Sequence, residues 1–267
     1  MRTLSILAIA ACSALSAGLP FRPSPVPGGV AFVPLPGANP REARFNGERV
    51  IVWPNGQGWA AVVGIPLDAK PGTAFVEMDG KRIAFTIKPA HYAVQRLTVK
   101  NPHQVNPDAE EEARIAKEQA LIKPIWEARP EGLTANLSFI QPAAGRLTSS
   151  FGLRRFFNGE ARAPHSGLDI AAPQGEAVRA PAEGRVMLTG DFFFSGNTVL
   201  IAHGDGVVSF LCHMKDLAVA QGQMVKAGDL IGHVGMTGRA TGPHLHWSLS
   251  LNNARVDPRL FLETAAR

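Results

Sequence analysis

Alternating apolar and polar positions dominate the chain from residue 44 to about residue 100. The apolar runs are short, and dipeptides such as Asn46-Gly47, Asn55-Gly56 and Asp79-Gly80 separate them. These dipeptides favour tight hairpin turns between strands. The runs that we predict as strands are 49–53, 59–63, 74–78, 82–87 and 95–99. Short strands at this spacing predict a small β-sandwich or barrel over 44–100.

The next segment, 101–135, has the pattern of a helical linker. Asn106 can cap a helix, Pro107 suits its first position, and the acidic residues that follow favour the positive end of the helix dipole. We expect the helix to end at Ile122, before Pro124. The acidic residues could instead hold a metal ion, but acidic first turns are ordinary in helices.

The strand pattern returns after residue 136 and no long helix-period segment interrupts it. The segments that suit strands are 145–152, 184–188, 197–202, 207–212, 230–234 and 244–251. The predicted fold class is therefore all-β and mostly antiparallel. It consists of a twisted-sheet domain over 136–267, a smaller N-terminal β-sandwich-like domain and a helical linker between them.

The first residues predict export from the cytoplasm. Residues 1–19 combine a positive start at Arg2 with an apolar stretch and small residues for cleavage, which is typical of a signal peptide. The alternatives are a lipoprotein signal, with Cys12 as the lipidated residue that anchors the protein to a membrane, and an uncleaved anchor. Cleavage of the signal peptide removes Cys12, and a lipoprotein signal modifies it. In both cases Cys212 is the single internal cysteine, so no internal disulfide is expected. Prolines concentrated over 20–43 predict an extended linker, in which Val30-Ala-Phe-Val33 could start a strand.

The composition is that of a folded protein, with 45% hydrophobic and 18% charged residues. A net charge of +5 and a pI of about 9.6 suit a polyanionic surrounding such as a cell wall or a membrane surface, and equally a generally basic soluble protein. No dense run of lysine and arginine is present, so a nucleic-acid partner is not predicted. The pattern indicates no particular oligomeric state. The expected location is the periplasm or cell envelope.

Histidines concentrate in the second half of the chain. Six of the eight fall between His165 and His246. His165 lies four residues before Asp169, His244 lies two residues before His246, and His213 stands between the two groups. Two imidazoles and one carboxylate can hold Zn²⁺ and leave a fourth position open for water. Such a set predicts a hydrolytic site rather than a structural one.

The last predicted strand has one polar and one apolar face. Histidine and serine occupy the even positions of 244–251, and leucine and tryptophan the odd ones. His244 and His246 then lie roughly 6 to 7 Å apart, so that one can bind a metal while the other faces the substrate. Both could instead be exposed on a sheet surface. Asp169 favours the metal site, because its apolar strand would bury the carboxylate at high cost without a partner.

Four blocks of the sequence together resemble one known family. They are Gly145-Arg-Leu-Thr-Ser-Ser-Phe-Gly-Leu-Arg154, His165-Ser-Gly-Leu-Asp-Ile-Ala-Ala-Pro173, Gly196-Asn-Thr-Val-Leu-Ile-Ala-His-Gly204 with His213, and Val225-Lys-Ala-Gly-Asp-Leu-Ile-Gly232 with Gly235 to His246. The chain over residues 140–255 is similar in these blocks to the lysostaphin-type (LytM-domain) zinc endopeptidases, which cleave peptide bonds in bacterial peptidoglycan. The proline-rich start and the first β region are similar to the module that precedes this domain in some exported relatives.

The resemblance implies roles for individual residues. His165, Asp169 and His246 match the three ligands of one Zn²⁺ ion. His213 and His244 match the family's catalytic histidines, and either could be the general base. Asn197 is expected to line the substrate groove.

One part of the motif departs from the family pattern. Leu211-Cys212-His213 stands where the family usually has tyrosine, a small residue and histidine. The missing phenol would remove one hydrogen-bond donor from the transition state and lower the rate. Strand alternation predicts that Cys212 faces away from His213 as a buried apolar residue. His203 and His233 are expected in turns or at the surface, outside catalysis.

The sequence thus predicts an exported zinc-dependent endopeptidase that hydrolyses peptidoglycan peptide bonds through a metal-activated water. One alternative is a catalytically inactive LytM-type module that binds cell wall or activates another wall hydrolase. Another is a zinc peptidase that acts on protein. A further hypothesis is that the N-terminal β module covers the groove and keeps the enzyme latent.

Overall fold

The computed structural model describes residues 19–37, 42–56 and 58–262. The export signal predicted for 1–19 lies outside these residues apart from Leu19, and so does the alternative lipidation site at Cys12. In the described part of the chain, no helix is both long enough and apolar enough to cross a membrane.

The N-terminal sheet has six strands in the order β1-β4-β3-β2-β5-β6, and all its pairs are antiparallel. The strands are β1 Val30–Leu35, β2 Ala43–Phe45, β3 Glu48–Pro54, β4 Trp59–Gly64, β5 Gly72–Met78 and β6 Lys81–Ile87. The outer strands β1 and β6 also contact each other, so the sheet curls around its own apolar core. β1 falls inside the segment 20–43 predicted as a linker, and it pairs with β4 over its whole length.

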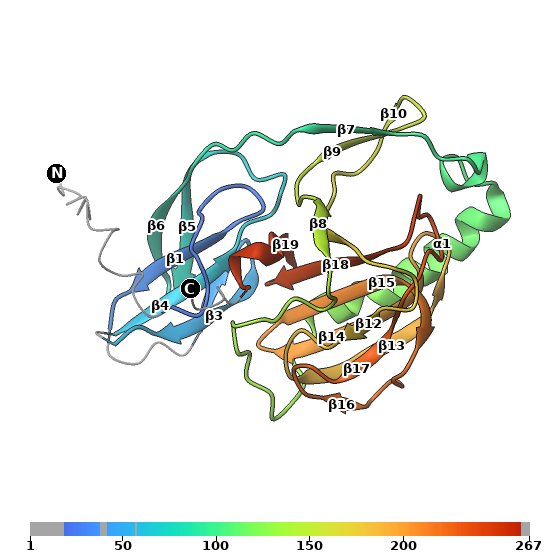
Figure 1. The fold of residues 1–267 in the computed structure, drawn as a ribbon. Coiled ribbons are helices and arrows are strands. Elements are labelled where there is room, and N and C mark those ends of the chain that lie inside the picture. Colours follow the sequence, from blue (N-terminus) through green and yellow to red (C-terminus); the bar gives the residue numbers. More distant parts are fainter. Residues whose placement is uncertain (1–18, 38–41, 57, 263–267) are drawn as a thin grey trace.

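The connecting segment joins the second half of the chain through one short strand. β7 (Val94–Leu97) pairs in parallel with β9 (Arg154–Phe157), and β10 (Glu160–Ala161) pairs with the other edge of β9. Figure 1 shows β7 crossing from the N-terminal sheet to the side of β9. A 3-10 turn, η1 (Pro102–Gln104), follows β7 before the helix. The strand predicted over 95–99 thus pairs with the second half of the chain rather than with the N-terminal sheet, and the segment 94–105 is called the linker.

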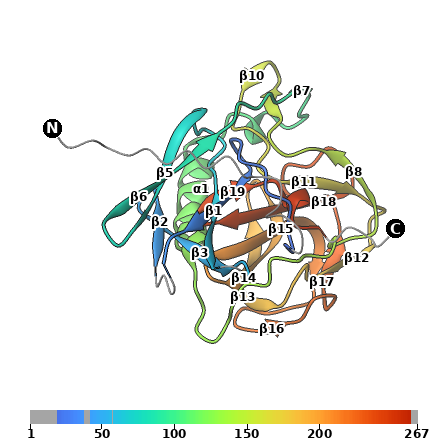
Figure 2. The ribbon, with the colours of Figure 1, turned by 90° about the vertical axis from the view of Figure 1, so that its left-hand side faces the viewer.

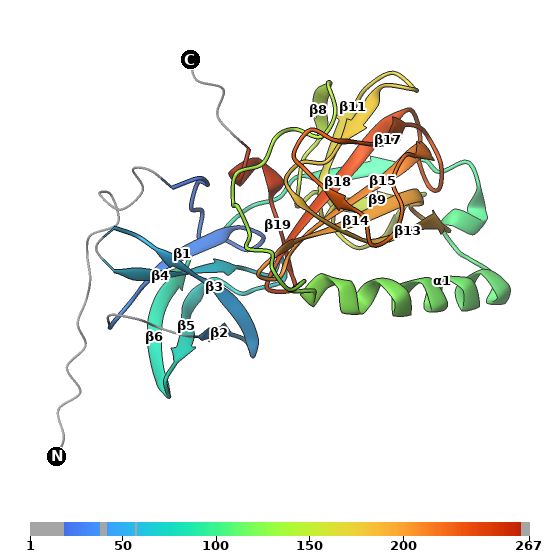
Figure 3. The ribbon, with the colours of Figure 1, turned by 90° about the horizontal axis from the view of Figure 1, so that it is seen from below.

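The helix α1 spans Ala109–Ile122 and continues into the 3-10 turn η2, Lys123–Glu127. Its end at Ile122 was predicted, but its cap is Asp108 and not Asn106. The Asp108 carboxylate accepts hydrogen bonds from the first-turn amides, and Glu111 closes the capping box. α1 lies along the outside of the second sheet (Figure 3).

The second sheet has ten strands, seven of them in the order β16-β13-β14-β15-β18-β11-β8, and all its pairs are antiparallel. Its strands are β8 Arg146–Ser149, β11 Leu168–Ala171, β12 Ala177–Arg179, β13 Gly184–Phe192, β14 Gly196–Gly204, β15 Val207–Leu217, β16 Met224–Val225, β17 Leu230–Val234, β18 His244–Leu251 and β19 Ala254–Val256. A last 3-10 turn, η3, spans Pro258–Leu260. The mostly antiparallel all-β class is confirmed; β7 with β9 is the parallel pair among the described strands.

The two sheets pack against each other at the end of β18, where β4 contacts β18 and β19; Figure 2 views this junction from the side of the N-terminal sheet. The side-chain amide of Asn252 donates to the Gly64 carbonyl at 3.0 Å, and its oxygen accepts from the Gly64 N–H at 2.7 Å. A Cβ at residue 64 would lie 2.7 Å from the Leu251 carbonyl oxygen, so this contact requires glycine. One apolar cluster extends across the junction, from Val62 to Trp247. The N-terminal sheet is thus fixed to the strand that carries His244 and His246.

Candidate metal centre

Strand pairing brings Asp169 and His246 together. Asp169 on β11 lies directly opposite His246 on β18, so both side chains leave the sheet on the same face. His165 comes from the loop before β11, and its backbone is hydrogen-bonded to Leu153 and Gly152. The loop residue Gly167 leaves room for the His246 imidazole, because a Cβ at residue 167 would lie 2.8 Å from that ring. Residues 77 positions apart therefore meet at one point.

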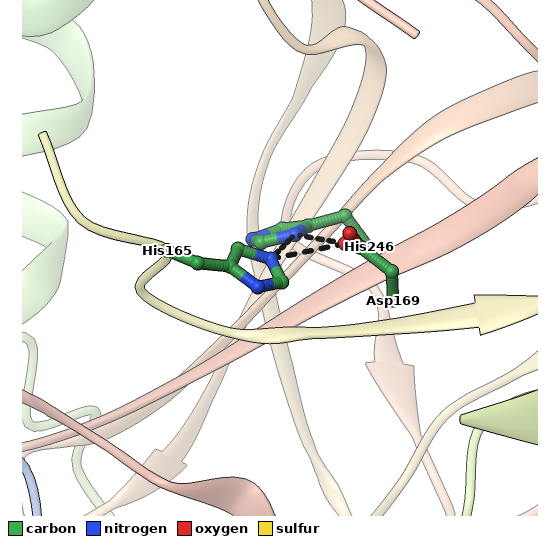
Figure 4. Close-up of side chains that lie close together, drawn as sticks. All are labelled: His165, Asp169 and His246. Atoms are coloured by element: carbon green, nitrogen blue, oxygen red, sulfur yellow. Dashed lines mark hydrogen bonds and ion pairs between the residues drawn. The ribbon is translucent and has the colours of Figure 1, made fainter. Parts of the chain in front are cut away.

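Three donor atoms form a nearly equilateral triangle, and the three side chains point toward one another in Figure 4. His165 Nε2 lies 3.0 Å from Asp169 Oδ1 and 3.0 Å from His246 Nδ1. His246 Nδ1 lies 2.9 Å from Asp169 Oδ1. Zinc at about 2.0–2.2 Å from each atom would place tetrahedral ligands about 3.3 Å apart, so the triangle fits with shifts of a few tenths of an ångström.

Hydrogen bonds on the far side of His165 also favour a cation here. Its Nδ1 is 2.9 Å from the Ser150 carbonyl oxygen, which can only accept, so Nδ1 carries the proton. In the neutral ring, the Nε2 lone pair then faces the Asp169 carboxylate. Two acceptors at this separation need a proton or a metal ion between them. His246 has the complementary arrangement, with Nε2 placed 2.9 Å from Ser248 Oγ and Nδ1 toward the site.

Burial and charge determine the protonation of this cluster. Burial alone would raise the pKa of Asp169, but its close contacts with the His165 and His246 rings hold it far below its usual range. Burial lowers the pKa of His246 to about 4, although Asp169 opposes this shift. At neutral pH the site therefore offers an anionic carboxylate and an uncharged His246 ring, which are the forms that bind metals.

A second layer of side chains holds the ligands in place. Arg155 on β9 donates from Nη2 to Asp169 Oδ2 at 3.1 Å and from Nε to Gln95 Oε1 at 3.0 Å. Gln95 is on β7, and its Nε2 lies 3.4 Å from Ser149 Oγ. Ser149 Oγ in turn lies 3.2 Å from His165 Nδ1. Such contacts orient metal ligands and tune their basicity. The parallel β7–β9 pair supplies this support.

His213 and His244 lie beside the ligand cluster with their rings close together. Their ring centroids are 4.8 Å apart, and His213 is 6.2 Å from the His246 ring. His213 Nδ1 donates to the Thr237 carbonyl at 2.9 Å, and His244 Nδ1 donates to the Gly242 carbonyl at 2.8 Å. In the neutral rings both Nε2 atoms are therefore unprotonated. Burial, and then the charges of His244 and His246, lower the pKa of His213 to about 3.

The backbone at His213 corrects the predicted orientation of Cys212. His213 has a φ of 66°, and the pairing of β14 with β15 shifts register beside it, so simple alternation fails. Cys212 lies directly opposite His246 and lines the same cavity as His213. The thiol is buried as predicted, and burial raises its pKa well above the usual value. Leu211, at the family's tyrosine position, is buried opposite Trp247.

Two other predicted positions differ from expectation. Asn197 does not line the cavity; its Nδ2 donates to the carbonyls of Met214 and Lys215, and these contacts support a role in holding β14 against β15. His203 is buried in β14 rather than exposed in a turn. His233 is a half-buried surface residue whose Nδ1 lies 2.6 Å from Asp216 Oδ1.

The cluster opens into a cavity of about 890 Å³. His165, Asp169, His213, His244 and His246 all line it. Its other walls come from the linker segment 97–105, from β9 and from the loop that precedes β18. No residue of β1–β6 lines it, so the linker, rather than the N-terminal sheet, lies beside the predicted groove. Sequence reasoning missed Arg155; the available signal was that a buried carboxylate such as Asp169 needs a cationic partner.

Comparison with known proteins identifies the family. Peptidase family M23 matches residues 163–258, and the peptidase family M23 N-terminal domain matches residues 23–89. A crystal structure of a putative peptidase M23 from Pseudomonas aeruginosa has a TM-score of 0.75 and 40% sequence identity. That match covers 89% of this chain and 95% of the crystallised one.

Curated relatives match less than half of the chain. A DD-carboxypeptidase/endopeptidase Mpg of Neisseria meningitidis serogroup B is 42% identical over 113 residues, which is 42% of this chain and 26% of the relative. A peptidoglycan DD-endopeptidase ShyA of Vibrio cholerae is 39% identical over 113 residues, with the same coverage. The matched region thus spans about a quarter of these relatives. The two family matches and the similarity over nearly the whole crystallised protein show that this chain belongs to peptidase family M23.

Proposed function

We propose that this chain is an exported, zinc-dependent endopeptidase that hydrolyses peptide bonds in bacterial peptidoglycan. The observation that carries the proposal is the convergence of His165, Asp169 and His246 within 3.0 Å of one another, at a cavity that two further imidazoles also line. A structural zinc site would use four protein ligands. Three protein ligands beside an open cavity support a catalytic one.

The donor set supports zinc in particular. Two imidazole nitrogens and one carboxylate oxygen are the ligands of several zinc hydrolases. When bound, zinc polarises the scissile carbonyl and lowers the pKa of water toward neutrality. The chain's own contribution is to hold the three ligands rigidly, through the β11–β18 pairing and the bond from Arg155 to Asp169.

His213 and His244 divide the proton transfers between them. Backbone carbonyls fix Nδ1 of each ring as a donor, which leaves both Nε2 atoms to exchange protons. One ring accepts the proton of the attacking water and passes it to the leaving amine. The other ring takes a proton from solvent onto Nε2 before the attack and donates it in a hydrogen bond to the oxyanion of the tetrahedral intermediate, keeping that proton throughout. Their ring centroids, 4.8 Å apart, lie close enough to serve one scissile bond.

Three further observations support peptidoglycan as the substrate. The curated relatives include proteins named as peptidoglycan DD-endopeptidases. The net charge of +5 favours a polyanionic wall, and residues 1–19 predict export toward it. Lipid attachment at Cys12 remains the alternative way of reaching the envelope.

The test compares residues 20–267 with two histidine variants. Wild type is expected to bind one zinc per chain and to release soluble fragments with new amino ends from purified peptidoglycan. His246→Ala removes a ligand and is expected to lose both properties. The matched control is His91→Ala, which changes an exposed histidine away from the cavity and should behave as wild type.

Three outcomes would contradict the proposal. Wild type that binds zinc but releases no fragments from peptidoglycan would indicate a binding or activating module. Cleavage of an unstructured protein with intact peptidoglycan would indicate a zinc peptidase of protein substrates. Full activity of His246→Ala would remove the metal centre from the mechanism.

A further inference from the structure

Arg239 lines the cavity with its guanidinium between two aromatic rings. The guanidinium carbon lies 4.6 Å from the centroid of Phe157 and 4.3 Å from that of Phe194. Arginine interacts favourably with aromatic rings at such distances. The ring contacts hold the guanidinium in place while leaving its N–H donors available.

The hydrogen bonds of Arg239 use little of its donor capacity. Nη1 donates to the Gln104 carbonyl at 3.0 Å. Within the described ranges, no carboxylate lies within ion-pair distance of Arg239. Guanidinium has five N–H donors. Among the described residues, no Arg239 nitrogen is both fully buried and without a partner, so the remaining donors are accessible on a side chain that lines the cavity.

The charges around Arg239 are predominantly positive. The cavity lining includes Lys100, Arg155, Arg162 and Arg239, with Asp169 as its acidic residue. Arg155 is paired with Asp169, and Arg162 with Glu160 outside the lining. Burial, followed by the charges of Arg155 and Arg162, lowers the pKa of Arg239 to about 10. The charged form of Arg239 therefore carries an unfavourable desolvation and repulsion energy, which an anion bound in the cavity would offset.

The backbone around Arg239 is fixed before any ligand binds. Arg239 N–H donates to the Phe194 carbonyl at 2.8 Å. Gly238 has a φ of 68°, and a Cβ there would lie 2.4 Å from the Gly196 nitrogen, so the loop packs tightly on β14. The same loop supplies Thr237, whose carbonyl fixes His213. A substrate group held by Arg239 is thereby placed in fixed relation to the catalytic histidines.

We propose that Arg239, assisted by Lys100, binds a carboxylate of the peptide substrate in the cavity that holds the metal centre. The proposal rests on the proposed peptidase function and specifies the substrate as an anionic peptide. A fixed guanidinium with free N–H groups matches a carboxylate in a bidentate arrangement. The carboxylate can be the C-terminal group of the peptide or a side-chain group, and both present the same chemistry.

The experiment uses a soluble cross-linked peptidoglycan peptide in four forms. They are the parent acid, the C-terminal carboxamide, the side-chain carboxamide and the doubly amidated peptide. Residues 20–267, loaded with zinc, should cleave the parent with a kcat/KM about 10-fold or more above one of the single amides, as expected for a hydrogen bond to a charged group. The single amide with the lower kcat/KM shows which of the two carboxylates, C-terminal or side-chain, Arg239 binds.

Variants of Arg239 show whether the preference comes from this residue. Arg239→Gln should lower kcat/KM for the parent about 10-fold or more and cleave acid and amide equally, while the doubly amidated peptide is cleaved as by wild type. Lys100→Gln, at an exposed position, should reduce the preference by a smaller factor. The matched control Arg185→Gln changes an exposed arginine that does not line the cavity, and should keep the full preference.

The outcomes separate this proposal from the proposed function. Wild type that cleaves acid and amides equally well overturns the carboxylate site but leaves the peptidase. An equal loss for all four peptides in Arg239→Gln, with Lys100→Gln unchanged, assigns Arg239 a structural role and overturns the proposal. No cleavage of any form by wild type contradicts the peptidase itself. In that case, equal binding of acid and amide by the inactive His246→Ala variant, measured by calorimetry, also rejects the carboxylate site.

Discussion

The two sides of the cavity are built in different ways. On one side, Asp169 and His246 project from paired strands, and their polar atoms contact neighbouring side chains. On the other, Arg239 lies on a loop against the linker turn that contains Gln104, with most of its donors free. A hydrogen-bonded sheet can hold metal-ligand atoms in position to within tenths of an ångström. A loop and a linker can instead vary in the group they present, which suits the recognition of substrate.

The largest expected effect is on the sheet side, at Asp169. Asp169→Asn removes the anionic ligand, and the metal supplies several kcal/mol of transition-state stabilisation. We expect kcat/KM to fall at least about 1000-fold together with loss of bound zinc. Enzyme kinetics and metal analysis measure the two effects. Asp68→Asn, at an exposed position away from the cavity, is the control; retained zinc and turnover in Asp169→Asn would refute the ligand assignment.

The stability of the sheet that carries the metal centre should decrease at low pH because of His203 on β14. Nδ1 of this buried histidine donates to the Glu183 carbonyl, and its Nε2 accepts from Ser209 Oγ, which also accepts from the Trp247 indole. Burial lowers the pKa of His203 to about 4, from 6.5 in the unfolded chain. Its contribution to stability is complete above pH 6.5 and is lost as the pH falls toward 4, a total of about 3 kcal/mol.

Urea unfolding of the metal-free protein between pH 7 and pH 4 measures this contribution. His203→Gln does not titrate in this range, so its stability should fall by about 3 kcal/mol less than that of wild type. His91→Gln removes an exposed histidine and should leave the wild-type dependence unchanged. Parallel stability curves for wild type and His203→Gln would show that His203 titrates normally in the fold.

Arg155 joins the two sides, because it contacts both Asp169 and the linker residue Gln95. Arg155→Met keeps the length of the side chain but removes both hydrogen bonds. Loss of a contact that orients a metal ligand typically lowers metal affinity about 10- to 100-fold. Competition with a coloured chelator measures this affinity. Arg154→Met alters the exposed neighbour on β9, and a decrease of the same size in both variants would contradict a specific role for Arg155.

The sheet side was the more predictable one because strand alternation is a local property. The histidine and leucine alternation of β18 placed His244 and His246 on one face, and the apolar run around Asp169 predicted its strand. Cys212 was placed on the wrong face because the left-handed backbone of His213 interrupts the alternation. Such a conformation is uncommon outside glycine, and histidine, although enriched in it, rarely adopts it, so the sequence signal for it at His213 is weak.

The linker side depends on contacts that are distant in sequence. The parallel pairing of β7 with β9 brings Gln95 to Arg155, and no local pattern announces which strand a linker segment joins. Arg239 meets Gln104 across 135 positions. Helix caps show the same limit on a smaller scale, since Asn106 and Asp108 are both good caps and only the packing selects Asp108.

The smallest expected effect tests whether the linker side is held as loosely as this comparison implies. Gln104 Nε2 donates to the Gly238 carbonyl at 3.0 Å, and Gln104→Ala removes this bond while the backbone carbonyl that binds Arg239 remains. A bond of this kind contributes about 1 kcal/mol, so amides near residue 104 should exchange hydrogen about fivefold faster. The Asp169 strand, held by sheet hydrogen bonds, should exchange as in wild type. Gln119→Ala, on the exposed face of α1, is the control. Faster exchange throughout β11 and β18 in Gln104→Ala would show instead that linker and sheet open as one unit.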